Sequence, residues 1–311
     1  MNNKTNFQRI KELIQAFFKS LPMSLTSKNS KKYFGAVKFQ DWFTPTIPPE
    51  KSEDLLITWI GHSSFLIQVG GFNILVDPIF DDLMFLYKRN FKPGILLNDL
   101  PKIDFILISH NHGDHFHKKT ILKLRNHNAK ILIPKGMKFW FDYNNFTEVY
   151  EKDYWQESIF ELDNKKIKID FLPAIHWSGQ HLFDINKSIW GSWMISCKDK
   201  NIYFAGDSAY GNHYKEISKK YHSIDAALMP ISPCAPREFV KESHLDAHEA
   251  VKAFIDLGAK NFIPMHWGTF RINLDQFDYP IQLLNKSWNS FSENLNDKKL
   301  HVLKFGQRVK F

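Results

Sequence analysis

The feature that most constrains the fold of this chain is the stretch His110-Asn111-His112-Gly113-Asp114-His115. It follows the apolar run 105–109, which is typical of a buried strand. Three imidazoles and a carboxylate therefore fall within six residues at a strand end, and these are the groups that bind borderline metal ions. His110 and His112 alternate along the backbone, so in an extended segment both side chains point the same way. We predict a metal site at this strand end.

Composition limits the class of protein. The 311 residues are 43% hydrophobic, enough for one large core or two small ones. We find no run of 18 uncharged apolar residues and no secretory signal, so we predict no transmembrane helix. Two cysteines, Cys197 and Cys234, exclude a disulfide scaffold and favour a reducing, cytoplasmic location. The net charge of +8 is compatible with nucleic acid, an anionic membrane surface or an anionic substrate, and charge alone does not choose among them.

We divide the chain into three parts. Residues 1–25 carry apolar side chains at helical spacing together with lysine and arginine, which predicts an amphipathic helix. This helix could dock on the body, on a second subunit of a homodimer, or on an anionic bilayer as an interfacial helix. Residues 26–50 are rich in serine, lysine and proline and indicate a linker. Residues 51–311 form the main domain.

The main domain contains two similar halves. Each half is predicted to hold a hairpin that ends in an aspartate (Asp77 or Asp207), then a buried strand, a helix and another strand. The predicted elements of the first half are 55–60, 64–69, 72–76, 105–109, the helix 117–127 and 129–134. Those of the second half are 192–196, 201–205, 224–231, the helix 247–257 and 259–264. Two β-β-α-β units placed face to face would give an α/β domain with two sheets and the helices outside.

Further candidate ligands also fall at strand ends. His176 follows the run 171–175, Asp207 ends the second hairpin, and His266 follows 263–265. Together with the first stretch they supply five histidines and two aspartates, enough for two ions with three or four protein ligands each. An aspartate between the ions can bridge them. Ligands of this type suit zinc, although iron or manganese could occupy similar sites.

The chain resembles the metallo-β-lactamase superfamily, whose binuclear signature is His-x-His-x-Asp-His. More closely, it resembles the N-acylphosphatidylethanolamine-hydrolysing phospholipase D family over roughly residues 40–311. The stretches that carry this resemblance are Trp59-Ile60-Gly61-His62, Val76-Asp77-Pro78-Ile79-Phe80, Leu107 to His115, His176-Trp177, Trp190-Gly191-Ser192-Trp193, Phe204-Ala205-Gly206-Asp207, Pro236-Arg237 and His266-Trp267-Gly268-Thr269-Phe270.

The resemblance implies a four-layer αββα sandwich with two zinc ions. It assigns His110, His112 and His176 to one zinc and Asp114, His115 and His266 to the other, with Asp207 bridging. It also implies that His244 lies at the mouth of the site, where it could reach a substrate phosphate. A loop histidine with a local hydrogen bond is the alternative for His244. His62 and Asp77 would support ligands or be purely structural.

The implied activity is zinc-dependent hydrolysis of phosphodiesters. We expect Asp114, Asp207 and His244 to take part in catalysis, with Asp207 orienting the attacking water. The expected substrate is an N-acylphosphatidylethanolamine-type phospholipid, cleaved to phosphatidic acid and an N-acylethanolamine. We expect a peripheral position at the inner membrane face, with contact through Phe85, Tyr87 and Phe91 in the aromatic loop 80–100.

Other readings stay open. A related binuclear hydrolase could act on a small lactone or a soluble phosphodiester. Nucleic acid is not an expected partner because we find no added nucleic-acid module. A membrane scaffold with a vestigial site is disfavoured by the complete set of seven ligands. The chain also departs from the family at Ser243, at Cys234 and at Ser178-Gly179-Gln180. These positions would contact the substrate and not the metal. The resemblance therefore supports the type of reaction more strongly than it supports the identity of the substrate.

Overall fold

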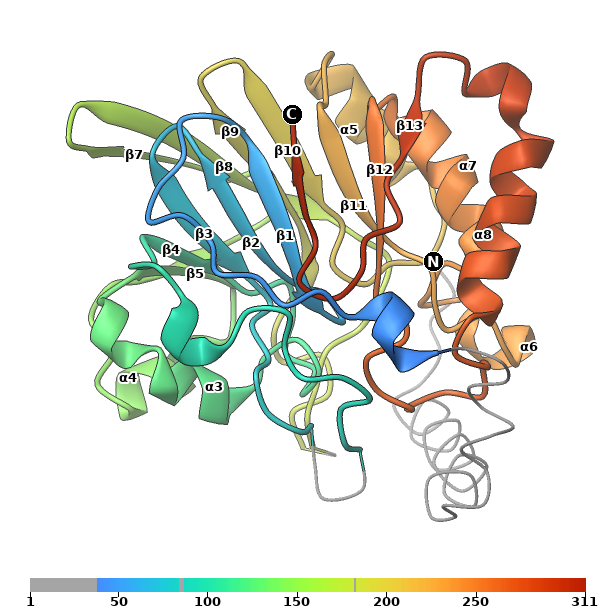
Figure 1. Cartoon of the computed structure of the whole chain (residues 1–311). Coiled ribbons are helices and arrows are strands. Elements are labelled where there is room, and N and C mark those ends of the chain that lie inside the picture. The colour runs from blue at the N-terminus through green and yellow to red at the C-terminus, as the bar shows by residue number, and fades with distance from the viewer. Residues whose placement is uncertain (1–37, 84–86, 182) are drawn as a thin grey trace.

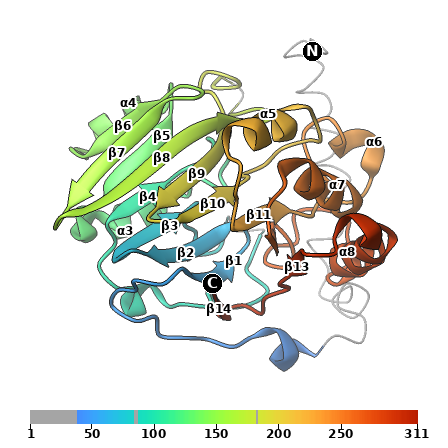
Figure 2. The same ribbon diagram turned by 90° about the horizontal axis from the view of Figure 1, so that it is seen from above.

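The computed structural model describes residues 38–83, 87–181 and 183–311. Two β-sheets face each other and helices cover their outer faces, which gives the expected four-layer α/β sandwich (Figures 1 and 2). The predicted helix over 1–25 lies outside the described residues, as do 26–37 of the predicted linker. No helix in the described part of the chain is long and apolar enough to cross a bilayer.

The first sheet has seven strands in the order β14-β1-β2-β3-β4-β5-β6. The strands β1, β2 and β3 are antiparallel, and β3 to β6 are parallel. Their bounds are β1 Leu56–Gly61, β2 Ser64–Val69, β3 Phe72–Val76, β4 Phe105–Leu107, β5 Lys130–Pro134, β6 Val149–Lys152 and β14 Arg308–Lys310.

The second sheet repeats this plan in the order β13-β12-β11-β10-β9-β8-β7. The neighbouring strands from β7 through β10 pair in antiparallel fashion, and those from β10 through β13 pair in parallel. The bounds are β7 Glu157–Leu162, β8 Lys165–Pro173, β9 Gly191–Cys197, β10 Lys200–Phe204, β11 Ala226–Pro230, β12 Asn261–Met265 and β13 Lys299–Leu300. Each sheet therefore contains a hairpin followed by parallel strands, as the two predicted halves require.

The helices form the two outer layers. Beside the first sheet lie α3 Lys118–Lys123 and α4 Lys138–Tyr143, and beside the second lie α5 His213–Lys220, α6 Arg237–Val240, α7 Ala247–Leu257 and α8 Tyr279–Ser290 (Figure 1). Short 3-10 turns are η2 Phe39–Trp42, η3 Leu97–Asp99, η4 Arg125–His127 and η5 Ser292–Asn294. Helix α7 has the predicted bounds because Asp246 accepts a hydrogen bond from the Glu249 amide at 2.8 Å and Gly258 ends the helix in a left-handed conformation.

Strand β4 explains why the run before the histidines is continuously apolar. Phe105 and Leu107 pack into the core between the two sheets, whereas Ile106 and Ile108 pack beneath α3 and α4. Successive side chains of a strand point to opposite faces, so a strand covered on both faces needs no polar positions. The burial of β4 fixes where its end lies, and with it the start of the histidine stretch.

Residues 87–91 of the loop 80–100 are folded against the body, so the prediction that Tyr87 and Phe91 meet a membrane is wrong. These side chains are 8% and 6% exposed, and Phe91 stacks on Phe305 with ring centroids 4.5 Å apart. Arg89 holds the loop by donating to the carbonyls of Ile79 at 3.0 Å and Phe91 at 3.1 Å. Phe85, the third predicted contact, lies outside the described residues.

The segment 38–50 also contacts the domain. Trp42 meets Trp267 edge-on at 5.1 Å between ring centroids. The Thr44 amide donates to the Phe305 carbonyl at 2.8 Å. This segment therefore lies beside the chain that immediately follows His266.

Candidate metal centre

The predicted ligands meet where strands of both sheets end. The first sheet supplies the stretch after β4, and the second supplies residues that follow β8, β10 and β12. The turns are tight: His266 has φ +65° and Gly206 has φ +58°. A Cβ on Gly206 would lie 2.7 Å from Cβ of Ser109 and 2.8 Å from the Gly191 carbonyl oxygen. Glycine at this position therefore lets the turn that carries Asp207 approach β4 closely.

One group of ligand atoms is formed by His110, His112 and His176, all within 4.8 Å of one another. The His110 Nε2 atom is 2.9 Å from Nδ1 of His112, and Nε2 of His176 is 3.1 Å from the same atom. His110 and His112 therefore point into the same group, as predicted, with their ring planes at 80° to each other. Trp177 packs edge-on against His112, with ring centroids 4.1 Å apart. The sequence shows Trp177 only as part of the His176-Trp177 stretch and gives no signal of this contact.

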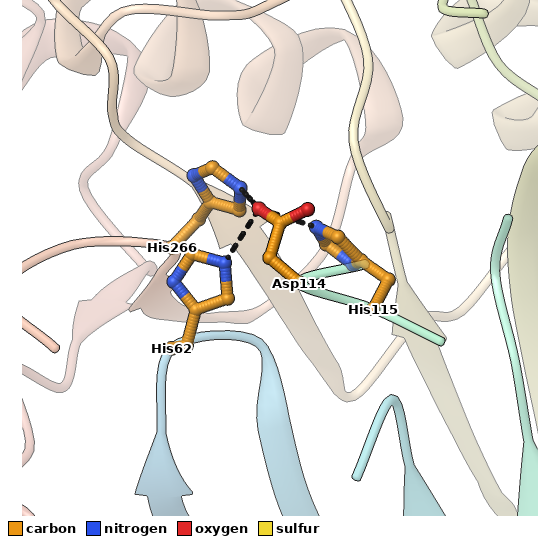
Figure 3. A group of neighbouring side chains, drawn as sticks. All are labelled: His62, Asp114, His115 and His266. Atoms are coloured by element: carbon orange, nitrogen blue, oxygen red, sulfur yellow. Dashed lines mark hydrogen bonds and ion pairs between the residues drawn. The ribbon is translucent and has the colours of Figure 1, made fainter. Parts of the chain in front are cut away.

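A second group consists of Asp114, His115, His266 and His62, as Figure 3 shows. Oδ2 of Asp114 is 3.4 Å from Nε2 of His266 and 3.8 Å from Nε2 of His115. His62 lies 3.0 Å from the same oxygen through its own Nε2. His62 thus contacts the predicted ligand Asp114, which favours the supporting role over the purely structural one.

Asp207 lies between the two groups. Its Oδ2 atom is 3.2 Å from Nε2 of His266, 3.3 Å from Nε2 of His115 and 3.8 Å from Nε2 of His176. The carboxylate can therefore be shared by ions in both groups, which is the geometry expected of a bridging ligand. The structure brings all seven predicted side chains together, while their roles as ligands stay predictions.

The chemistry of the cluster fits metal ions. Buried atoms of the cluster that lack a hydrogen-bond partner include Nε2 of His115 and His266 and Oδ1 of Asp207. An unpaired buried polar atom costs about 1–3 kcal/mol, so several of them converging in one place call for a binding partner. Cations would satisfy the two imidazole nitrogens, and a water bound beside the cations would satisfy Oδ1 of Asp207.

The two groups differ in protonation. In the first group, burial lowers the pKa of His112 to about 3 and of His176 to about 4. These imidazoles are therefore neutral, the form that binds metal. In the second group, burial opposes the charge on His266, but Asp207 and Asp114 outweigh it and raise the pKa to about 9. Burial likewise disfavours the charge on Asp207, yet His115 and His266 hold its pKa well below its usual range.

Other hydrogen bonds orient the imidazoles. Nδ1 of His176 donates to the Ser243 carbonyl at 2.7 Å, and Nδ1 of His266 donates to the Ser232 carbonyl at 2.9 Å. Each bond fixes the proton on Nδ1 and leaves Nε2 directed into the cluster. Partners of this kind set the tautomer and orientation of metal-binding histidines.

His244 lies at the edge of the cluster. Its Nδ1 atom is 3.6 Å from Oδ2 of Asp207, and its ring is 4.9 Å from that of His176 between centroids. Nδ1 makes no hydrogen bond, and burial lowers the pKa of the imidazole well below its usual value. A neutral imidazole at this point can contact a substrate that lies over Asp207.

This fold and this cluster of histidines and aspartates define a metal-dependent hydrolase of the β-lactamase type. A family model described as a beta-lactamase superfamily domain matches residues 72–267. The chain therefore belongs to the β-lactamase superfamily.

Two relatives indicate where in the superfamily the chain lies. It is 29% identical over 266 residues to "N-acyl-phosphatidylethanolamine-hydrolyzing phospholipase D 1" of Caenorhabditis elegans, covering 81% of this chain and 75% of the relative. It is 32% identical over 248 residues to "N-acyl-phosphatidylethanolamine-hydrolyzing phospholipase D, mitochondrial" of Saccharomyces cerevisiae, covering 76% of this chain. That match spans 53% of the yeast protein, about half of its length.

Solved structures share the fold. A metallo hydrolase from the archaeon Ignicoccus hospitalis superposes with a TM-score of 0.63 at 24% identity, covering 83% of this chain and 98% of its own. CmlA, a diiron β-hydroxylase from Streptomyces venezuelae, superposes with a TM-score of 0.59 at 18% identity, covering 84% and 54% of the two chains. Because these proteins carry out different reactions on one fold, the substrate has to be argued from the site and the sequence relatives.

Proposed function

We propose that this protein is a zinc-dependent phosphodiesterase that hydrolyses N-acylphosphatidylethanolamine-type phospholipids to phosphatidic acid and N-acylethanolamine. The observation that carries the proposal is the position of Asp207, within 3.8 Å of imidazole nitrogens from both ligand groups. A shared carboxylate suits a pair of ions that together hold one phosphodiester. The two named relatives support the choice of lipid.

The residues of the chain have distinct tasks in this reaction. When bound, the metals supply Lewis-acid activation of water and offset charge on the phosphoryl oxygens. Oδ1 of Asp207 lies free in the cluster and accepts a hydrogen bond from the attacking water, which orients it toward phosphorus. His244 contacts a phosphate oxygen at the mouth. Asp114 completes the second group and is held in place by His62.

Contact with a lipid surface involves a different set of aromatic side chains from those expected. Phe139 and Tyr143 of α4 are 82% and 78% exposed, and Phe183 is 87% exposed. The backbone before α4 meets the segment after Phe183, because the Ile189 amide donates to the Lys135 carbonyl at 3.0 Å. Lys138 and Lys187 are exposed nearby. Apolar rings next to lysines suit the surface of an anionic bilayer.

A direct test is to incubate the metal-loaded protein with a mixed lipid extract and to identify the products by mass spectrometry. Release of N-acylethanolamine together with phosphatidic acid supports the proposal. Parallel assays with a water-soluble phosphodiester and a lactone test the other readings. Turnover of the lactone without turnover of the lipid would replace the proposal with that of a small-molecule hydrolase. Asp207→Asn serves as the inactive control.

A further inference from the structure

The segment 243–245 carries His244 over the metal centre and is held by its backbone. The Ser243 carbonyl accepts the bond from Nδ1 of His176 at 2.7 Å, and the Leu245 amide donates to the Ser208 carbonyl at 2.7 Å. Ser208 directly follows Asp207. We call residues 243–245 the mouth segment. Its position relative to Asp207 decides where the His244 imidazole lies.

Arg237, at the start of α6, makes a further contact with this segment. Its Nη1 atom donates to the His244 carbonyl at 2.8 Å. Its Nη2 atom pairs with Glu249 of α7, and Nε is 3.4 Å from Oδ2 of Asp246, the residue that caps α7. The guanidinium is 25% exposed. Arg237 therefore joins the mouth segment to the first turn of α7, a helix that packs one face into the core.

Arginine is suited to this task by its shape. The planar guanidinium presents donors in several fixed directions, so one side chain can meet a carbonyl and two carboxylates together. A lysine carries the same charge as a single point on a flexible stem and can satisfy these acceptors only in turn. The bonds therefore set a position for the His244 backbone as well as supplying charge.

We propose that Arg237 is a positioning residue for substrate binding, acting through His244. By holding the His244 carbonyl against the start of α7, it keeps the imidazole over Asp207, where a phosphate oxygen of the substrate would lie. This inference rests on the proposed function because it takes the ligand of His244 to be a phosphate group. Arg237 itself contacts neither the metal ligands nor, on this account, the substrate.

The test is a double-mutant cycle between the two residues, measured by binding rather than by turnover. The zinc-loaded protein is titrated with inorganic phosphate by calorimetry for the wild type, Arg237→Ala, His244→Ala and the double variant. We expect each single variant to weaken phosphate binding about tenfold, the size of one lost hydrogen bond. We expect the double variant to bind no more weakly than His244→Ala, because without the imidazole there is nothing left to position. Zinc content should stay at the wild-type level.

Three further variants separate positioning from stability. Arg237→Lys keeps the charge but loses the planar set of donors, so we expect its phosphate affinity to be as low as that of Arg237→Ala. Glu249→Gln removes the ion pair but keeps the bond to the His244 carbonyl, so we expect a lower melting temperature with phosphate affinity unchanged within about twofold. Arg125→Ala removes a remote arginine, which donates to the Asn144 carbonyl at 2.6 Å, and should leave phosphate affinity unchanged. If Arg237→Ala does not fold, Arg237→Lys takes its place in the cycle.

Two results would overturn the inference. One is an additive cycle, in which Arg237→Ala weakens binding as much without His244 as with it. The other is a loss of affinity in Glu249→Gln equal to that in Arg237→Ala, which would show a purely structural role. The proposed function fails separately, if the wild type binds phosphate with the expected cycle but releases no N-acylethanolamine from lipid.

Discussion

Asp77 accepts a hydrogen bond from Nδ1 of His115 at 2.6 Å. The same carboxylate accepts from the Ser109 hydroxyl at 2.6 Å and from the Ser109 amide at 2.7 Å. Asp77 is fully buried at the end of β3, and Ser109 follows β4, so this carboxylate ties the hairpin to the start of the histidine stretch. The bond fixes the proton of His115 on Nδ1 and directs Nε2 toward Asp207.

This relationship predicts that Asp77→Asn weakens metal binding. An amide in place of the carboxylate presents one NH2 group to donors that need an acceptor, so the tautomer and orientation of His115 are lost. We expect zinc affinity to fall roughly 10–100-fold, measured by competition with a chelator. Asp170→Asn is the matched control, because Asp170 is also fully buried but accepts from Tyr221, away from the cluster. Equal zinc affinity in the wild type and Asp77→Asn would contradict the assignment.

Asp207→Asn should separate metal binding from turnover. The amide keeps the size of the side chain but loses the charge that both ligand groups share, so we expect hydrolysis of the phosphodiester to fall at least about 100-fold. Metal content measured on the same sample shows how many ions remain. Turnover like that of the wild type, with both metals still bound, would exclude the role given to Asp207.

Zinc binding should release protons in a way that depends on pH. Without metal, His266 has a pKa of about 9, so it is protonated near neutral pH and must lose its proton to become a ligand. His112 and His176, with pKa values of about 3 and 4, are already neutral and release none. Burial opposes the charge on His115, but Asp207, Asp114 and Asp77 outweigh it and hold the pKa of His115 well above its usual value, so His115 also loses a proton on binding. The number of protons released should therefore fall as the pH rises through the pKa values of His266 and His115. Calorimetric titrations in buffers of different ionisation enthalpy measure this number, and a constant value across the range would refute the assignment.

Removal of the exposed aromatic rings should weaken membrane binding. We expect the variant Phe139→Ser/Tyr143→Ser to bind anionic vesicles at least about tenfold more weakly in a sedimentation assay. The reason is that inserting two aromatic rings into the bilayer surface contributes several kcal/mol of binding free energy. Hydrolysis of a water-soluble phosphodiester should not change. Ile159→Ser is the control, because Ile159 is 53% exposed on the edge strand β7. An equal loss of vesicle binding in the control would show that Phe139 and Tyr143 do not form a specific membrane contact.

The meeting of the seven side chains was largely predictable because they follow apolar strands that the sequence marks clearly. His110 and His112 lie after a run that is buried on both faces, and Asp207 and His266 occupy matching places in the second half. The loop 80–100 was not predictable from its own residues. Phe91 is buried against Phe305, more than two hundred residues later in the chain, and nothing local to the loop indicates that contact.

Arg237 shows a second kind of limit. The sequence marks it as part of a Pro-Arg pair, but its partners His244 and Glu249 become visible only when α6 and α7 are placed side by side. The helix cap at Asp246 was predictable, because capping depends on residues three apart in the chain. Local rules thus predicted the elements, and long-range packing decided which side chains meet between them.

Each ligand group takes side chains from both sheets. His110 and His112 follow β4 of the first sheet, whereas His176 follows β8 of the second, and the group of Asp114, His115 and His266 is divided in the same way. An ion in either group is consequently a cross-link between the two halves of the sandwich, and its binding free energy becomes part of the free energy of folding. A chain whose halves have not closed on each other holds no complete group, so metal loading itself reports that folding is finished.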